Sequence, residues 1–288
     1  MSAVSTRRGT LCLTVDNLGM ALAVGRRRVA RPDPDEPGLR WGVPALLDLF
    51  ADLRLRSTFF VEGWNALHHP DVIERVASAG HEIGLHGWVH ERWAEDLDDR
   101  AREQLLCDGT AALRLAGFDP VAFRAPGGYR GGRTLEVLSD LGYRIDSSID
   151  VRDGAPGTTP AITSLSGGLV CIPWTWDMID FWQYEIRPDG PRMPGQVAED
   201  WMELTEAAAD RGGLVTLIIH PFVTGVDPER MAAIRRVLEH AIEHPGIDVL
   251  SAGQAVEAHL SQVSGAAVDM GRRAANSGSA PHRTGTAR

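Results

Sequence analysis

The amino-acid sequence predicts a single α/β domain built as a distorted (β/α) barrel of seven to eight parallel strands. Short apolar, β-prone runs alternate with stretches of helical periodicity through most of the 288 residues. This alternation is typical of a parallel sheet whose strands are joined by helical crossovers, and seven or eight such units favour a barrel over an open sheet. The length of the chain is also in the range of one such barrel.

In the first half of the chain, each expected strand leads into a loop or a helix. Strands are expected at residues 11–15, 57–61, 81–85 and 121–124, and helices at 43–53, 70–80, 97–116 and 133–141. The charged segment 26–38 contains three prolines and lacks periodicity, so we expect a surface loop there. A glycine-rich loop, residues 124–130, precedes the fourth helix.

The second half continues the same alternation up to a polar tail. Strands are expected at 143–148, 168–173, 213–219 and 247–250, helices at 197–210, 228–244 and 252–260, and a loop at 154–163. The aromatic run 174–182 is too polar for a simple core strand. From residue 264 the chain lacks apolar periodicity, so we assign the barrel to residues 1–263 and expect 264–288 to be disordered.

Charge and apolar patterning exclude several classes of partner. The chain has 29 Lys and Arg against 39 Asp and Glu, a net charge of −10, which opposes binding to nucleic acid or to an anionic membrane. No run approaches the roughly 18 apolar residues that a membrane-spanning helix needs. We therefore expect neither a nucleic-acid nor a membrane partner and leave open a homo-oligomer.

The cysteines and the N-terminus indicate a reducing compartment. Cys12, Cys107 and Cys171 are an odd, widely spaced set in apolar surroundings, which predicts reduced core thiols. Asp16 and Asn17 interrupt the first apolar run after only a few residues, so no secretory signal is recognised and a cytoplasmic location is expected.

Polar or aromatic residues follow several of the expected strands. They are Asp16, His86 with His90, Arg124, Trp176 and His220. In barrels of this class, active sites are built at the carboxyl ends of the strands, so these side chains are expected to converge. His86 and His90 lie four residues apart, and neutral imidazoles are common ligands for zinc and similar ions. This spacing could serve one metal ion.

Five motifs in order resemble the NodB-homology polysaccharide deacetylase family over roughly residues 10–262. Thr14-Val15-Asp16-Asn17 is similar to the family's Thr-Phe-Asp-Asp, His86-Gly87-Trp88-Val89-His90 to its His-x-x-x-His, and Arg124-Ala125-Pro126 to its Arg-x-Pro. The stretches Leu141–Ser148 and Leu217–His220 also resemble recurring family segments.

The resemblance implies a metal-assisted hydrolysis of an amide, usually of an N-acetyl group. It implies a divalent metal ion, with Zn²⁺ as our expectation, at Asn17, His86 and His90. It implies Asp16 as general base, oriented by Arg124, and His220 as general acid. These roles agree with the chemistry, since amide hydrolysis needs an activated water, a stabilised oxyanion and a proton for the departing amine.

The chain departs from the family at Asn17, where an aspartate normally ligates the metal. An amide oxygen is an uncharged and weaker ligand than a carboxylate, so metal binding is in question. Two alternatives stay open. In the first, Asn17 coordinates an ion that is held less tightly; in the second, Asp16 shifts to ligate and the base is left unassigned.

The substrate region also departs from the polysaccharide enzymes. Gly127-Gly128 stands where many polysaccharide enzymes have bulkier residues. The run Ile172–Asp180 and the stretch His220–Gly225 look like the subgroup related to metal-independent allantoinases and cyclic imidases. We expect substrate contacts from Trp176, Trp88, Tyr129 and Asp180.

Three functions compete. The first is a metal-dependent hydrolase that removes an acyl group, with acetyl as the expected one, from an amide nitrogen of a sugar or small molecule. The second is a cyclic amide or imide hydrolase, which need not use a metal. The third is a non-catalytic carbohydrate-binding protein on the same scaffold, against which the retained Asp16, Arg124 and His220 argue.

Overall fold

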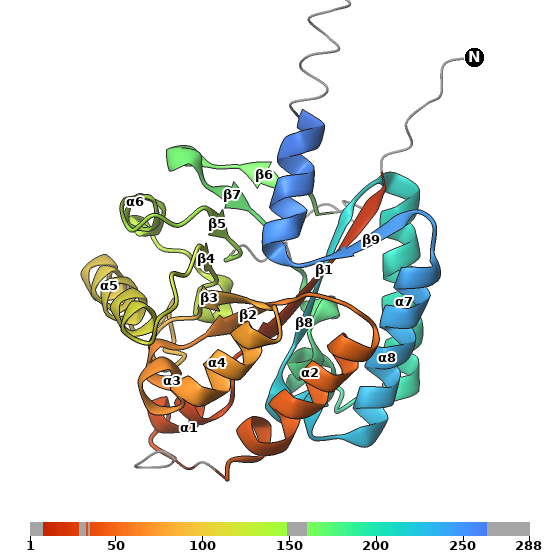
Figure 1. Cartoon of the computed structure of the whole chain (residues 1–288), viewed down its shortest axis with the longest axis horizontal. Helices are drawn as coiled ribbons and strands as arrows, with labels where there is room; N and C mark the ends of the chain where they lie inside the picture. The colour runs from red at the N-terminus through yellow and green to blue at the C-terminus, as the bar shows by residue number, and fades with distance from the viewer. Residues whose placement is uncertain (1–7, 29–32, 34, 149–159, 264–288) are drawn as a thin grey trace, which may run out of the picture.

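The computed structural model describes residues 8–28, 33, 35–148 and 160–263, and the tail predicted at 264–288 lies outside them. Within the described residues, nine strands form one curled sheet in the order β6-β7-β5-β4-β3-β2-β1-β8, with β9 also paired to β1. Helices surround this sheet, as Figure 1 shows. The predicted class, one α/β domain with a distorted barrel, is confirmed.

Strand β1 (Gly9–Asp16) pairs with three other strands and is almost completely buried. One edge pairs in parallel with β8 (Leu214–Ile219) over nearly its whole length. The other edge is shared: its second half pairs with β2 (Thr58–Val61) and its first half with β9 (Ile247–Leu250). A strand buried on all sides reads as a continuous apolar run, which is why the sequence revealed β1 clearly.

The remaining strands are short and extend the sheet away from β2. They are β3 (Glu82–Leu85), β4 (Ala122–Phe123), β5 (Ile145–Asp146), β7 (Val170–Cys171) and β6 (Thr163–Ser164). Each of these pairs is parallel except β6 with β7, which is antiparallel. The antiparallel edge pair was not predicted, because β6 is only two residues long and both residues are exposed.

Irregular backbone spans the gap between β7 and β8. Ile179 forms a parallel bridge with Ile218. The Leu214 N–H donates to the Pro160 carbonyl at 3.1 Å, and the Thr216 hydroxyl donates to the Pro173 carbonyl at 2.7 Å. Residues 174–182, predicted to be too polar for a simple core strand, therefore close the curled sheet without forming a strand.

The predicted helices are present with small shifts in their ends. They are α2 (Val43–Asp52), α4 (Pro70–Ser78), α5 (Asp99–Leu115), α6 (Thr134–Asp140), α7 (Pro194–Arg211) and α8 (Pro228–Glu243), and residues 252–263 are also helical. Two six-residue helices, α1 (Met20–Gly25) and α3 (Gly63–His68), were not predicted, because neither is long enough to show a helical period.

Short 3₁₀ and π turns complete the described secondary structure. They are η1 (Gly38–Gly42), η2 (Pro126–Gly128), η3 (Ser166–Gly168), η4 (Trp176–Met178), η5 (Trp182–Ile186) and η6 (Pro221–Gly225). Four of them, η2, η4, η5 and η6, lie in segments that follow β4, β7 and β8.

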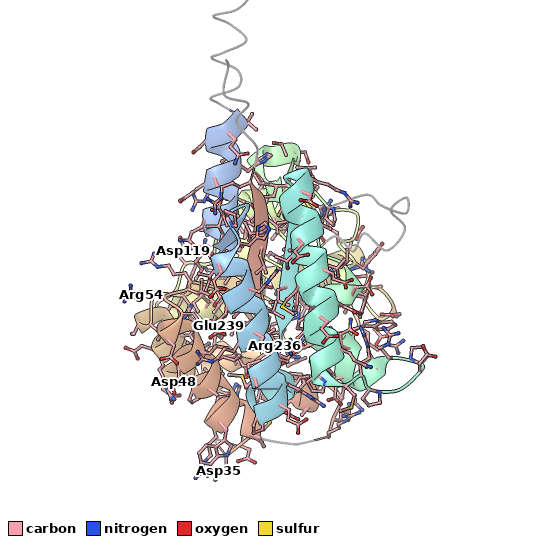
Figure 2. The ribbon with its side chains drawn as sticks, turned by 90° about the vertical axis from the view of Figure 1, so that its right-hand side faces the viewer. Asp35, Asp48, Arg54, Asp119, Arg236 and Glu239 are labelled. Carbon is pink, nitrogen blue, oxygen red and sulfur yellow. The ribbon has the colours of Figure 1, made fainter. Side chains whose placement is uncertain are left out.

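Helices α7 and α8 lie side by side against the sheet (Figures 1 and 2). On α8, Val237 and Leu238 are buried, whereas Arg236 and Glu239, labelled in Figure 2, are exposed. This is the period of an amphipathic helix that covers a core. None of the helices in the described ranges is long and apolar enough to span a membrane.

The cysteines are free, as predicted. Cys12 and Cys171 are buried and Cys107 is half-buried. Burial raises the pKa of the Cys12 thiol to about 12, which keeps it protonated and unreactive at neutral pH.

Gly128 allows a tryptophan to approach the loop that follows β4. Its φ is +84°, and a Cβ added there would lie 2.5 Å from Cζ2 of Trp174. A larger residue would have to push the indole away and adopt a left-handed backbone. The glycine therefore sets the position of Trp174, which lines the pocket described below.

We predict that Gly128→Ala lowers the free energy of unfolding by about 2–4 kcal/mol, through left-handed backbone strain together with overpacking against Trp174. Gly142→Ala is the matched control, because Gly142 has φ +88° but no atom within 4 Å of an added Cβ. The control should lose only about 1 kcal/mol. Urea unfolding of both variants measures the difference, and equal losses would contradict the packing account.

Candidate active site

The carboxyl ends of the strands open into a pocket of about 210 Å³. The residues predicted at strand ends line it: Asp16, Asn17, His86, His90, Arg124, Trp176 and His220. The remaining lining residues are Leu22, Arg26, Ala125, Gly127, Trp174, Ile179, Phe181, Ile186, Ile218 and Phe222. The structure thus brings together all six predicted base, acid, orienting and metal-ligating residues and one of the four predicted substrate contacts, Trp176.

Arg124 and Asp16 form a buried ion pair at the base of the pocket. Arg124 Nη1 lies 2.6 Å from Asp16 Oδ1 and also donates to the Thr14 hydroxyl at 3.0 Å. Its other nitrogens bond to Ser147, with Nη2 2.9 Å from Oγ. The guanidinium carbon lies 4.2 Å from the centroid of the Phe60 ring. Arg124 is therefore fixed, and it orients Asp16 by one carboxylate oxygen.

His86 presents an unprotonated nitrogen to the second carboxylate oxygen. Its Nδ1 lies 2.8 Å from the Arg124 carbonyl, which can only accept, so Nδ1 carries the hydrogen. Nε2 is then a free acceptor, 3.9 Å from Asp16 Oδ2 and too distant for a direct bond. Burial lowers the pKa of His86 to about 3, so the ring is neutral across the ordinary pH range.

His90 stands beside His86 with the same charge state. The two ring centroids are 5.0 Å apart, and burial lowers the pKa of His90 to about 3 as well. His90 has φ +58°, a left-handed conformation that is uncommon for residues other than glycine. This turn brings the second imidazole back to the pocket instead of continuing a helix.

Asn17 uses its amide oxygen in a local turn. Its Oδ1 accepts a hydrogen bond from the Gly19 N–H at 3.0 Å, and its backbone N–H donates to the Phe60 carbonyl at 3.1 Å. The Gly19 N–H is a donor and needs an acceptor, so the amide oxygen faces the turn and Nδ2 points away from it. That nitrogen is buried and has no hydrogen-bond partner among the described residues.

The residues present do not complete the predicted metal site. Catalytic zinc ions are usually held by three protein ligands. His86 and His90 offer neutral imidazoles, but the Asn17 oxygen already accepts from Gly19. Across the described part of the chain, no group of three or more His, Cys, Asp and Glu side chains could hold a metal ion. We therefore derive no catalytic step through a metal.

His220 follows β8, the strand paired with β1, and is held in the pocket by Asp180. His220 Nδ1 lies 2.6 Å from Asp180 Oδ1, and its backbone N–H donates to Oδ2 at 2.8 Å. Thr224 and the backbone of Phe181 also donate to this carboxylate. Burial alone would lower the pKa of His220, but the nearby carboxylates, Asp180 foremost, outweigh it and the pKa is raised.

Asp180 therefore does not have the predicted position at the substrate pocket. It was expected to contact substrate, but it is completely buried and does not line the pocket. Each of its oxygens already accepts hydrogen bonds, so the carboxylate holds His220 instead. Burial of a carboxylate requires such partners, and the sequence alone did not show which donors it would meet.

Trp88 and Tyr129 also lie off the pocket. Trp88 packs against Gly63, where an added Cβ would lie 2.8 Å from Cε3 of the indole. Tyr129 is 48% exposed, and its ring lies 4.9 Å from the Arg102 guanidinium carbon. Both residues follow strand ends in sequence, but the loops turn their side chains elsewhere. Of the four predicted substrate contacts, Trp176 alone lines the pocket.

Glu62 is a buried carboxylic acid that the sequence interpretation missed. It follows β2 directly, has no exposed surface, and accepts from Asn65 Nδ2 at 2.7 Å through one oxygen. Its other oxygen has no partner among the described residues. Burial raises its pKa to about 8. Its position after an apolar strand, like that of Asp16, is the signal that could have identified it.

Comparison with known proteins relates this chain to one family. Residues 34–145 match the family model for polysaccharide deacetylase. A peptidoglycan-N-acetylglucosamine deacetylase of Bacillus cereus is 34% identical over 140 residues, which cover 48% of this chain and 50% of that protein. The resemblance predicted from the motifs is confirmed, although the alignment spans only about half of this relative's length.

Solved structures agree over most of the chain. A Mycobacterium smegmatis protein assigned to the polysaccharide deacetylases is 29% identical with a TM-score of 0.77, covering 91% of this chain and 93% of that one. The allantoinase PuuE is 20% identical with a TM-score of 0.69, covering 88% and 91%. The second likeness concerns the fold alone.

We predict that Asp180→Asn lowers the pKa of His220, because it removes the nearest negative charge. Asp16 and Glu62, whose charges also raise this pKa, are left in place. In the wild type, the imidazolium form of His220 should persist above the usual range for histidine and disappear as the pH rises through the raised pKa. A shift of at least about one pH unit is expected. NMR titration of the His220 ring measures it, and an unchanged midpoint would contradict the assignment.

Proposed function

We propose that this chain, a relative of the polysaccharide deacetylases, is a hydrolase that removes an acyl group from an amide nitrogen. The observation that carries the proposal is that two oriented groups line one pocket: Asp16, tied to Arg124, and His220, tied to Asp180. A base for the attacking water and an acid for the departing nitrogen are what the hydrolysis of an amide requires. The acetyl group is the acyl group that the name of the Bacillus cereus relative supports.

Asp16 and His86 would hold the attacking water. Asp16 Oδ2 and His86 Nε2 are both acceptors, so one water can donate a hydrogen to each and turn a lone pair toward the acyl carbon. Asp16 then takes a proton from this water as the carbon–oxygen bond forms. Arg124 keeps the carboxylate in place through its bond to Oδ1.

The other two tasks fall to Asn17 and His220. The unpartnered Nδ2 of Asn17 can donate to the carbonyl oxygen on which negative charge develops. His220, in its protonated form, gives its proton to the amide nitrogen as the carbon–nitrogen bond breaks. Amide and water thus become a carboxylic acid and an amine, and both side chains return to their starting states after proton exchange with solvent.

Metal dependence, which the resemblance implies, has partial support from His86 and His90. A divalent ion held there would polarise the carbonyl and acidify water. The engagement of Asn17 favours the second candidate, a cyclic amide or imide hydrolase that works without a metal. The same residues serve both reactions, because opening a cyclic imide also adds water to a carbonyl and protonates a departing nitrogen.

The cytoplasmic location stays a prediction.

We predict that Asp16→Asn and His220→Ala each lower kcat/KM for release of acetate from an N-acetylated amine by roughly 100-fold or more, since each removes a general catalyst. Asp119→Asn is the matched control, because Asp119, labelled in Figure 2, is an exposed aspartate outside the pocket lining that pairs only with Arg114 among the described residues. Retention of full activity by either pocket variant would refute the proposed role of that residue.

We also predict that Asn17→Asp tightens the binding of Zn²⁺ by at least about tenfold, because a carboxylate adds a charged ligand beside the two imidazoles. Titration calorimetry on protein stripped with a chelator measures the affinity independently of turnover. In the stripped protein, the same variant should lose amide hydrolysis, since it replaces a donor with an acceptor. If the wild type binds Zn²⁺ tightly and Asn17→Asp leaves this affinity unchanged, the Asn17 side chain does not limit metal binding.

A further inference from the structure

The lining of the pocket is divided into a polar side and an apolar side. Asp16, Asn17, His86, His90 and Arg124, from the segments that end or follow β1, β3 and β4, form the polar side. The side of His220 is formed by apolar residues from β8, from the turns after it and from the segment that closes the sheet: Trp176, Ile179, Phe181, Ile186, Ile218 and Phe222.

Two phenylalanine rings lie beside the imidazole of His220. The Phe181 and Phe222 centroids lie 5.6 and 5.5 Å from its ring and 6.2 Å from each other. Trp176 extends this wall, with its ring 5.5 Å from those of Trp174 and Trp182. A leaving group beside His220 would therefore contact an aromatic surface.

This wall offers few partners for hydroxyl groups. Among the described residues that line the pocket there is no Ser, Thr or Tyr. The carboxylate and the amide of the lining belong to Asp16 and Asn17 on the polar side, and Asp180 is buried behind His220. Arg26, which is exposed, adds a donor to the lining. A sugar ring against this wall would leave several hydroxyls without the hydrogen bonds they make in water.

From this division we propose that the departing amine carries an apolar ring or chain, so that the preferred substrate is an N-acylated apolar amine and not an N-acetylated amino sugar. The inference rests on the proposed function, since His220 marks the amine side only if it protonates the departing nitrogen. The reaction is unchanged: water adds to the acyl carbon, the carbon–nitrogen bond breaks, and His220 supplies the proton to nitrogen.

A matched pair of substrates tests this directly. N-cyclohexylacetamide and N-acetylglucosamine share the acetyl group and a six-membered ring, and the sugar adds hydroxyls and a ring oxygen. We expect kcat/KM for acetate release to be at least about tenfold higher for N-cyclohexylacetamide, in the range by which an apolar pocket discriminates against added hydroxyls. Equal rates, or preference for the sugar, would overturn this inference and leave amide hydrolysis standing. Release of acetate from neither would overturn the proposed function.

A variant of the wall gives a second readout. Phe222→Ala should weaken the binding of cyclohexylamine, the amine product, by about 5–10-fold, through loss of apolar contact. Trp41→Ala is the matched control, because Trp41 is an aromatic residue that is 60% exposed and outside the pocket lining. Titration calorimetry measures binding, and thermal melting confirms that both variants are folded. Equal binding by wild type and Phe222→Ala would overturn the assignment of the wall.

Discussion

The buried ion pair between Arg124 and Asp16 is the constraint on which the rest of the site depends. A guanidinium with 1% exposure is tolerated only if nearly all its donors are matched, and Thr14, Asp16 and Ser147 match them from β1 and the end of β5. The same residue binds His86 through its backbone carbonyl. One side chain and its peptide group thus fix the carboxylate and the tautomer of the imidazole that face the substrate.

Much of the fold and the polar part of the site could be predicted, because both follow from local patterns. Buried parallel strands appear as apolar runs, and the first polar residue after each run falls at one rim of the barrel. This rule found Asp16, His86, Arg124 and His220, which all line one pocket. It would also have found Glu62, which follows β2 in the same way.

The parts that could not be predicted depend on contacts between distant segments. Asp180 follows no strand and becomes the partner of His220 through an irregular segment that closes the sheet. Trp88 and Tyr129 are close in sequence to pocket residues, but Gly63 and Arg102, from other elements, decide where their rings pack. The orientation of the Asn17 amide is likewise set by the Gly19 N–H, which sequence identity alone does not reveal.

The central claim is that Asp16 and His220 act on the same bond, and a double-mutant cycle tests it most directly. If the two groups work in one reaction, the variant that carries both Asp16→Asn and His220→Ala should be about as slow as the slower single variant, because neither group is useful without the other. If the two losses in kcat/KM instead multiply, the side chains act independently and the account is contradicted.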